Sequence, residues 1–277
     1  MKRNQAEQYR RVALTILLLL LAVVCVFPFL WMVSASFKNE ADVMEFPIKL
    51  IPDPVNKNNY RTVWLKSSFP SYYLNSVFVT AVVMAGSLAL STVAAYGFSR
   101  FRFRGKKIIF AVYMATLMVP VQVTLLPKYI YFGFLRINNT FWALILPGIF
   151  SAYNVYLMRQ YFDAVPAELT EAAEIDGAGY FRVFWQICFP LVRAGFVTML
   201  LFQFTWTWND YINPLIYCNK ESLLTLTVGL QRFQQSNSTH YALVMAGCTL
   251  ALAPLIILFL FTQKYYIESF ATSGVKG

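Results

Sequence analysis

Charged residues are scarce in this sequence of 277 residues. They account for 13% of the chain, while hydrophobic residues account for 58%, and an average soluble domain contains roughly 25% charged residues. This shortage argues against a water-soluble domain and favours an integral membrane protein.

Residues for metal binding, thiol chemistry and nucleotide binding are scarce as well. The chain has one histidine, His240, and no CxxC pair among its four cysteines. Ordinary apolar packing is the expected role of these cysteines, which are Cys25, Cys188, Cys218 and Cys248. The phosphate-binding motif G-x-x-x-x-G-K-[ST] is absent, because Arg100 stands where its first glycine would precede Gly105 and Lys106. We therefore expect no catalytic residue, metal site or cofactor in this chain.

Apolar runs, in contrast, are long and numerous. A helix needs about 20 apolar residues to cross about 30 Å of hydrocarbon, and six runs reach that length: 12–33, 71–99, 108–126, 137–158, 194–217 and 242–263. Proline and glycine inside several runs are tolerated in membrane helices. The first run is too long for the apolar part of a secretory signal and ends in bulky residues, so we expect it to be retained. The sequence predicts an all-α membrane protein with six transmembrane helices in a domain spanning 12–263.

Lys and Arg orient these helices, because cytoplasmic loops are enriched in both. The loop RFRFRGKK at 100–107 contains five basic residues and no acid, so it belongs inside. Six alternating spans then place the N-terminal segment 1–11 and the tail 264–277 in the cytoplasm, with 14 of the 23 basic residues inside. The outward loop 34–70 fits least well, since it carries five basic residues, though also four acids. The net charge of +10 thus indicates topology in a cell membrane rather than nucleic-acid binding.

One long connection, 159–193, differs from the rest of the chain. Residues 163–176 hold five acids and no basic residue, whereas helices that rest on a membrane usually carry Lys and Arg. Good helix formers follow Pro166, and Gly177 is a natural C-terminal stop. The pattern predicts two short helices, the second from about Tyr180 to Pro190. A protein-docking role and a plain surface helix both remain open, with docking favoured.

The spacing in this connection resembles the EAA loop of ABC importer permeases, whose pattern is EAA-x3-G-x9-I-x-LP. Phe189 replaces the leucine of that pattern and keeps a large apolar side chain. The matching residues are Glu171, Ala172, Ala173, Gly177, Ile187 and Pro190. Further segments resemble the carbohydrate-uptake, maltose-type branch along roughly the whole chain: FPFLWMVSASFK, AAYGFSRFRFRGKK, MVPVQVTLLPKY, WNDYINPLIY and SGVKG.

The resemblance implies a transmembrane subunit that forms half of the pathway of an ATP-driven sugar importer, with an oligosaccharide as the expected solute. The EAA loop would be a coupling helix that docks in a cleft of a cytoplasmic ATPase. In that role Glu171 would contact a basic or polar group, Ala172 and Ala173 would permit close approach, and Gly177 would make the turn. The implied partners are a second homologous permease, two ATPases that bind ATP and Mg, and an extracytoplasmic solute-binding protein.

Two alternatives stay open. A permease of the same importer class could carry glycerol phosphate or another polyol. A self-contained secondary transporter would need several ionisable groups inside the membrane, and the six runs contain one acid, Asp210.

The segment TWTWNDYINP is the most polar part of any run and predicts a place on the substrate path. The candidates are Trp206, Asn209, Asp210 and Tyr211, because aromatic faces beside amide and carboxylate groups suit a sugar, and charges inside membranes are functional by default. Asp210 would lie about 25 Å along the helix from Arg193, near the outer surface. An interfacial aromatic belt, with Asp210 capping a helix broken at Pro214, is therefore the alternative. Gln122, Tyr153 and Asn154 are weaker candidates, expected to form interhelical hydrogen bonds.

Overall fold

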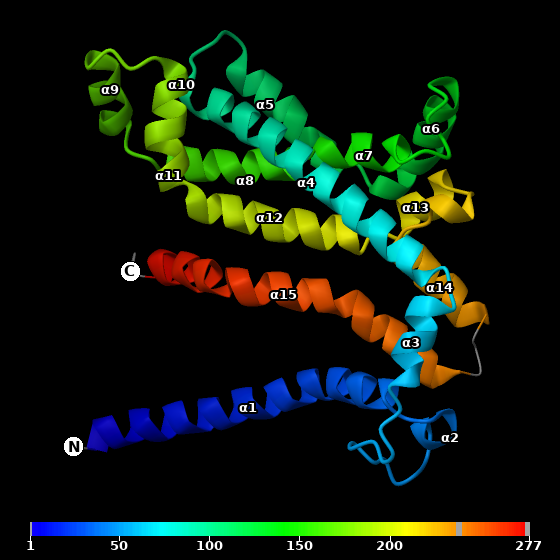
Figure 1. Cartoon of the computed structure of the whole chain (residues 1–277). Helices are drawn as coiled ribbons and strands as arrows, with labels where there is room; N and C mark the ends of the chain where they lie inside the picture. The colour runs from blue at the N-terminus through cyan, green and yellow to red at the C-terminus, as the bar shows by residue number, and fades with distance from the viewer. Residues whose placement is uncertain (1, 237–239, 275–277) are drawn as a thin grey trace. The chain divides into compact units, whose positions relative to one another are not determined.

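The computed structural model describes residues 2–236 and 240–274, and across these residues the chain is helical with no β-strand (Figure 1). The predicted all-α class is confirmed. The chain divides into two compact units, Met1–Pro70 with Leu230–Ala253, and Ser71–Gly229 with Pro254–Gly277. Both candidate sites lie in the second unit.

The first unit contains α1 (Lys2–Ser36), α2 (Glu40–Val43), α3 (Asn58–Leu65) and the beginning of α15 (Tyr241–Gly274). The leucine side chains in the middle of α1 are exposed, as suits a helix surrounded by lipid. The Glu40 carboxylate accepts the N–H groups of Tyr241 and Ala242 at 2.7 and 3.0 Å. These are two of the backbone donors that the first turn of a helix leaves unpaired, so Glu40 joins α2 to α15.

The second unit begins in α4 (Phe69–Arg100) and continues through shorter helices. These are α5 (Lys106–Ala115), α6 (Val121–Phe134), α7 (Trp142–Ile149), α8 (Ala152–Asp163), α9 (Ala167–Ile175), α10 (Tyr180–Val183), α11 (Phe189–Leu191), α12 (Arg193–Trp208), α13 (Ile212–Tyr217) and α14 (Leu226–Ser236). A 3₁₀ turn at Thr116–Met118 follows α5, a π-helical turn at Phe184–Cys188 joins α10 to α11, and a 3₁₀ turn at Glu221–Leu223 precedes α14.

Three helical segments are long and apolar enough to cross a membrane without interruption: Glu7–Ser36, Phe69–Arg100 and Tyr241–Lys264. Two bent pairs raise the number of candidate spans to five: Lys106–Met118 with Val121–Phe134, bent by 99°, and Tyr180–Leu191 with Arg193–Trp208, bent by 76°. The expected third run contains the first of these bends. The expected fourth and fifth runs are interrupted as well, between α7 and α8 and between α12 and α13.

The breaks have local causes. Pro120 forces Val119 into an extended conformation, with ψ 117°. The expected run 137–158 is divided between α7 and α8, because Phe150 and Ser151 are extended and the Ser151 hydroxyl accepts the N–H of Asn154, which starts a new helix. At the C-terminus the helix is longer than expected, since α15 continues to Gly274 where a polar tail is expected. Residues 275–277 of that tail lie outside the described residues.

One end of the second unit is held by an aromatic core beside the polar connection 159–193. The ring of Tyr96 in α4 packs edge-on against Phe162 of α8 and Phe184 of the π-helical turn, with centroids 5.5 and 4.9 Å apart. In the same region α8 and α12 run side by side (Figure 1). Gly195 permits this approach, because a β-carbon there would lie 2.4 Å from the ring of Tyr161. The core thus joins α4, α8 and α12 at the place where the connection begins and ends.

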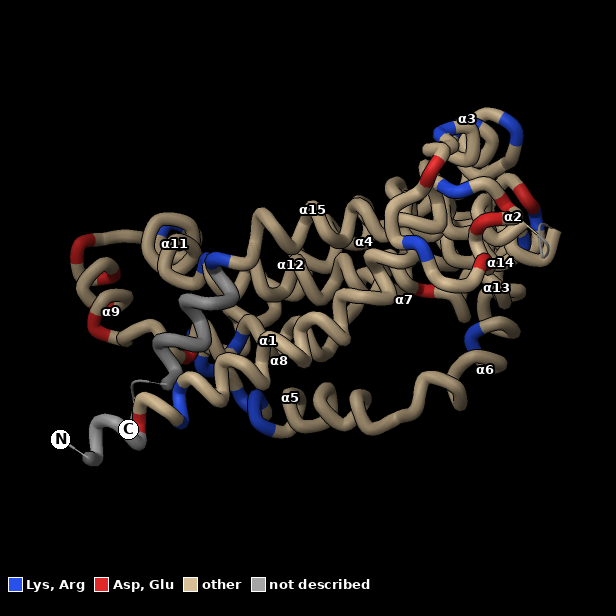
Figure 2. The backbone as a smooth tube through the Cα atoms, turned by 90° about the horizontal axis from the view of Figure 1, so that it is seen from below, with Lys and Arg blue, Asp and Glu red and all other residues tan. Residues whose placement is uncertain are grey.

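Charge is distributed along the helices as a bilayer requires. In Figure 2 the middles of α12 and α15 are free of acidic and basic residues, while α9 carries acids and the start of α5 carries lysines. Each long helix thus has an uncharged central section between polar ends.

Candidate functional site

The polar connection 159–193 contains α9, whose inner and outer faces are distinct. Thr170 is 7% exposed and Ala173 packs against the aromatic core, so these residues form the inner face. Glu171 and Ala172 are exposed. Glu168 and Glu174 of α9 are exposed as well, so the exposed side of the helix is acidic and also carries the small side chain of Ala172.

The turn after α9 is a Schellman motif built on Gly177. This glycine has φ +80°, and its N–H donates to the Glu174 carbonyl at 3.0 Å. The N–H of Ala178 donates to the carbonyl of Ala173 at 2.9 Å. Both bonds satisfy carbonyls that the end of a helix otherwise leaves unpaired. The predicted stop of the helix at Gly177 is confirmed.

The remaining residues of the EAA pattern lie on the next helical stretch. Ile187 is half-buried in the π-helical turn, and Pro190 is exposed in α11. Of the apolar side chains near the start of this stretch, Val183 and Phe184 are buried, whereas Phe181 is 77% exposed. On this stretch the buried side chains of Val183 and Phe184 are therefore outside the pattern, whereas the pattern residues Ile187 and Pro190 are half-buried and exposed, respectively.

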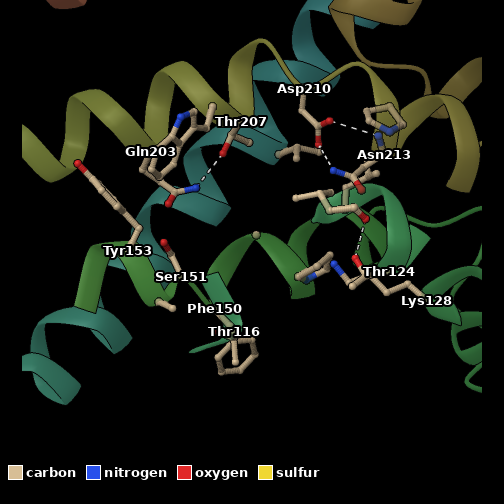
Figure 3. A pocket seen from close by; sticks show the side chains of 18 of the residues that line it. Thr116, Thr124, Lys128, Phe150, Ser151, Tyr153, Gln203, Thr207, Asp210 and Asn213 are labelled. Atoms are coloured by element: carbon tan, nitrogen blue, oxygen red, sulfur yellow. Dashed lines mark hydrogen bonds between the residues drawn. The ribbon is translucent and has the colours of Figure 1, made fainter. Parts of the chain in front are cut away.

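A second candidate site is a cavity of about 760 Å³ within the second unit, shown in Figure 3. Its polar side chains come from several helices: Thr116, Thr124, Lys128, Ser151, Gln203, Thr207, Asp210 and Asn213. Tyr153 and Trp206 add aromatic rings, 5.1 Å apart between centroids. In Figure 3, Gln203, Thr207 and Asp210 project from one side and Thr124 and Lys128 from another. Such a lining offers hydroxyl, amide and aromatic contacts to a polar solute.

Two of the four predicted path residues line this cavity, namely Trp206 and Asp210. Asn209 is exposed and its amide donates to the carbonyl of Thr205 at 2.9 Å. Tyr211 packs against a separate cluster formed by Tyr72, Leu224 and Val228. The chain turns between α12 and α13, so neighbouring residues of this segment point in different directions.

Asp210 binds the first turn of α13. Its carboxylate accepts the backbone N–H of Asn213 at 3.2 Å and the side-chain amide of Asn213 at 2.8 Å. The expected capping contact is therefore present, but the expected break at Pro214 is wrong, because the helix is interrupted at residues 209–211 and Pro214 lies inside α13. Asp210 lines the cavity at the same time.

A buried polar network crosses the unit beside the cavity. Asn154 is fully buried, and its amide donates to Ser87 of α4 at 3.0 Å and to Gln203 of α12 at 2.7 Å. Gln203 in turn donates to Thr207 at 3.0 Å. The prediction that Asn154 forms interhelical hydrogen bonds is confirmed, whereas Gln122 is exposed and outside the cavity lining.

Sequence reasoning missed Lys128, Gln203 and Thr207 as lining residues. Lys128 had a signal, because it is the one charged residue within Val121–Phe134. Gln203 and Thr207 are spaced by four residues, which places them on one face of a helix, but no sequence feature indicates that this face borders a cavity.

Discontinuous apolar helices around a cavity lined by both polar and apolar side chains are typical of an α-helical membrane transport protein, because interrupted backbone at membrane depth is tolerated where it is buried or lines a cavity. The family described as "Binding-protein-dependent transport system inner membrane component" matches residues 87–270. The chain belongs to this family, and the resemblance inferred from its motifs is confirmed.

Relatives match nearly the whole chain. It is 37% identical over 266 residues to the "Probable ABC transporter permease protein YurM" of Bacillus subtilis (strain 168), covering 95% of this chain and 87% of that protein. It is 32% identical to the "Maltodextrin transport system permease protein MalD" of Streptococcus pneumoniae, covering 99% of both chains. It is 31% identical to the "Arabinooligosaccharides transport system permease protein AraQ" of Halalkalibacterium halodurans, covering 95% of this chain and 96% of that protein.

Solved structures share the fold. A chain from the crystal structure of a bacterial ABC transporter involved in the import of the acidic polysaccharide alginate superposes with a TM-score of 0.83 at 24% identity, covering 94% of this chain and 98% of that chain. A chain from a complex of the alginate transporter with an alginate pentasaccharide-bound periplasmic protein gives a TM-score of 0.66 at 10% identity, covering 92% and 94%.

Proposed function

We propose that this chain is the transmembrane subunit of an ATP-driven carbohydrate importer, with an oligosaccharide as the expected solute. The supporting observation is full-length similarity, at 30% identity or more, to permeases named for maltodextrin and arabinooligosaccharide transport. Glycerol phosphate or another polyol is the alternative solute within the same class. Membership of a binding-protein-dependent family disfavours a self-contained secondary transporter.

The proposed contact with the ATPase is the connection 159–193. Glu171 and Ala172 are exposed together on α9, which is the chemistry that a cleft with a basic or polar group would accept. The resemblance implies that Ala173 permits close approach to the ATPase, but Ala173 packs against the aromatic core instead. It would therefore support this face together with the turn at Gly177, while the half-buried Ile187 would contribute packing on the following helical stretch, in which Pro190 is exposed.

The proposed assembly comprises this chain, a second homologous permease, two cytoplasmic ATPases that bind ATP and Mg, and an extracytoplasmic solute-binding protein. In this arrangement α1, α4, α5 with α6, α7 with α8, α12 with α13, and α15 are six spans. Both termini then face the cytoplasm, because the basic loop 100–107 does.

Charge reversal on α9 tests the proposal. We expect Glu171→Lys to abolish copurification with the ATPase and ATP-dependent uptake, since it would face a basic or polar group with a like charge. Glu45→Lys is the matched control, because Glu45 is exposed in the outward loop with Lys49 3.1 Å away, and we expect it to keep the ATPase bound.

Uptake of sugar by this chain alone in vesicles would contradict the proposal. Screening the cognate binding protein against neutral oligosaccharides and glycerol phosphate diesters separates the two solute classes.

A further inference from the structure

The C-terminal end of α4 is attached to the segment that leads into α9. One guanidinium nitrogen of Arg100, Nη2, donates to the carbonyls of Phe162 and Val165, each at 2.7 Å. The neighbouring Ser99 hydroxyl donates to the Asp163 carboxylate at 2.6 Å. Phe162 lies in the last turn of α8, where helical carbonyls lack intrahelical donors, and Val165 lies in the short turn between α8 and α9.

The same end of α4 is also attached to the segment that leaves α9. The hydroxyl of Tyr96 donates to the carbonyl of Tyr180 at 3.4 Å. Phe101, directly after α4, packs edge-on against the Tyr180 ring with centroids 5.1 Å apart. One turn of α4 therefore contacts the chain both before and after α9.

The helix α9 is separated from the end of α4 by a cavity of about 880 Å³, whose lining includes Arg100, Lys106, Thr170, Glu171 and Glu174. Direct packing across this space is therefore incomplete. Ala173 packs against the aromatic core, and the attachments at the two ends of α9 add to this contact. Among these attachments, Arg100 is the side chain that bonds to two backbone carbonyls.

We propose that Arg100 is the positioning residue that makes α9 and α4 move as one body, so that a displacement of α9 reaches the longest span of the second unit. The transport consequence rests on the proposed function, in which α9 is the contact with the ATPase. Arginine suits the role because its charge persists at any physiological pH and its planar group can serve two carbonyls at once. Lysine at this position would serve them less well, as a point donor on a flexible stem.

Hydrogen exchange on the purified full-length chain in nanodiscs tests the attachment without any ATPase. We expect Arg100→Gln to accelerate exchange of the α9 amides about tenfold, which corresponds to losing about 1.4 kcal/mol of local protection, and Ser99→Ala to accelerate it less. Arg104→Gln is the matched control, because Arg104 is exposed, with no hydrogen bond or ion pair seen within the described residues. Unchanged exchange in Arg100→Gln would overturn the proposal.

The assembled importer supplies a readout that a merely structural role would not move. We expect Arg100→Gln to keep the ATPase bound but to lower the solute transported per ATP hydrolysed at least fivefold, with Arg100→Lys recovering part of the loss. An unaltered ratio in the Arg100→Gln importer would overturn the proposal.

If Arg100→Gln does not fold, Ser99→Ala and Arg100→Lys carry the same test with smaller effects, and a wild-type ratio in both would overturn the proposal. If wild-type protein binds no ATPase, the proposed function fails, and the exchange measurement still decides whether Arg100 holds α9.

Discussion

At the scale of single residues, two glycines in the same connection carry different requirements. Gly177 adopts φ +80°, in the left-handed region that disfavours residues with a β-carbon. Gly179 has φ −69°, and a β-carbon there would meet nothing within 4 Å. A β-carbon would have room at both positions, so the expected effects of substitution at Gly177 and Gly179 differ only because of the backbone conformation.

We therefore expect Gly177→Ala to destabilise the turn by about 1 kcal/mol and Gly179→Ala to leave it nearly unchanged. A loss of this size raises the population of the locally opened loop about fivefold. Limited proteolysis between residues 164 and 180 measures it as a cleavage rate. Equal rates for the two variants would contradict the assignment of strain to Gly177.

At the scale of elements, the break between α12 and α13 determines which side chains reach the cavity. Trp206 is the last aromatic residue of α12 to line it, while Asn209 follows the helix and lies outside the lining. Asp210 ends the break by capping α13 through Asn213. Because of this turn, the side chains of neighbouring residues do not follow the regular angular spacing of a continuous helix.

If the cavity belongs to the substrate path, Trp206→Ala should lower the rate of sugar uptake at limiting solute about tenfold, which corresponds to about 1.4 kcal/mol of lost contact. Asn209→Ala should change it less than about twofold, because the Asn209 side chain bonds to its own helix. Uptake assays at equal ATPase occupancy compare the two. Trp206→Phe keeps an aromatic face, so we expect it to retain most of the rate, and equal losses for Trp206→Ala and Asn209→Ala would remove Trp206 from the path.

At the scale of the whole molecule, the proposed topology puts the connection 159–193 and the loop 34–70 on opposite sides of the membrane. Two exposed apolar residues report on these sides: Ile51, 83% exposed, and Ile175, 86% exposed. Neither lies in a candidate span, so each can be replaced by cysteine with little effect on packing.

In a background without the native cysteines, we expect Ile51→Cys to react with a membrane-impermeant maleimide in intact cells and Ile175→Cys to react only after permeabilisation. The reason is the excess of Lys and Arg in cytoplasmic loops. Lys66→Cys is a second outward control in the same loop. Labelling of Ile175→Cys in intact cells would contradict the proposed orientation and place the connection 159–193 outside.

Composition and motif spacing alone were enough to predict an all-α membrane protein, its importer family and the end of α9 at Gly177. The importer family followed from the resemblance of the EAA spacing and of further segments to known permeases. The all-α class and the end of α9 depend on local properties, namely the length of apolar runs, helix propensity and the tolerance of glycine for positive φ. They need no knowledge of distant contacts.

Only the tertiary structure decided where runs 108–126 and 137–158 break, which residues surround the cavity, and that Arg100 holds the chain before α9. Hydropathy counts apolar residues but does not report a bend at Pro120 or a new helix start at Ser151. Lys128, Gln203 and Thr207 meet because separate helices pack together, and the bonds from Arg100 join residues more than 60 positions apart. Local sequence specifies which helices form, whereas the packing of those helices determines which side chains face one another.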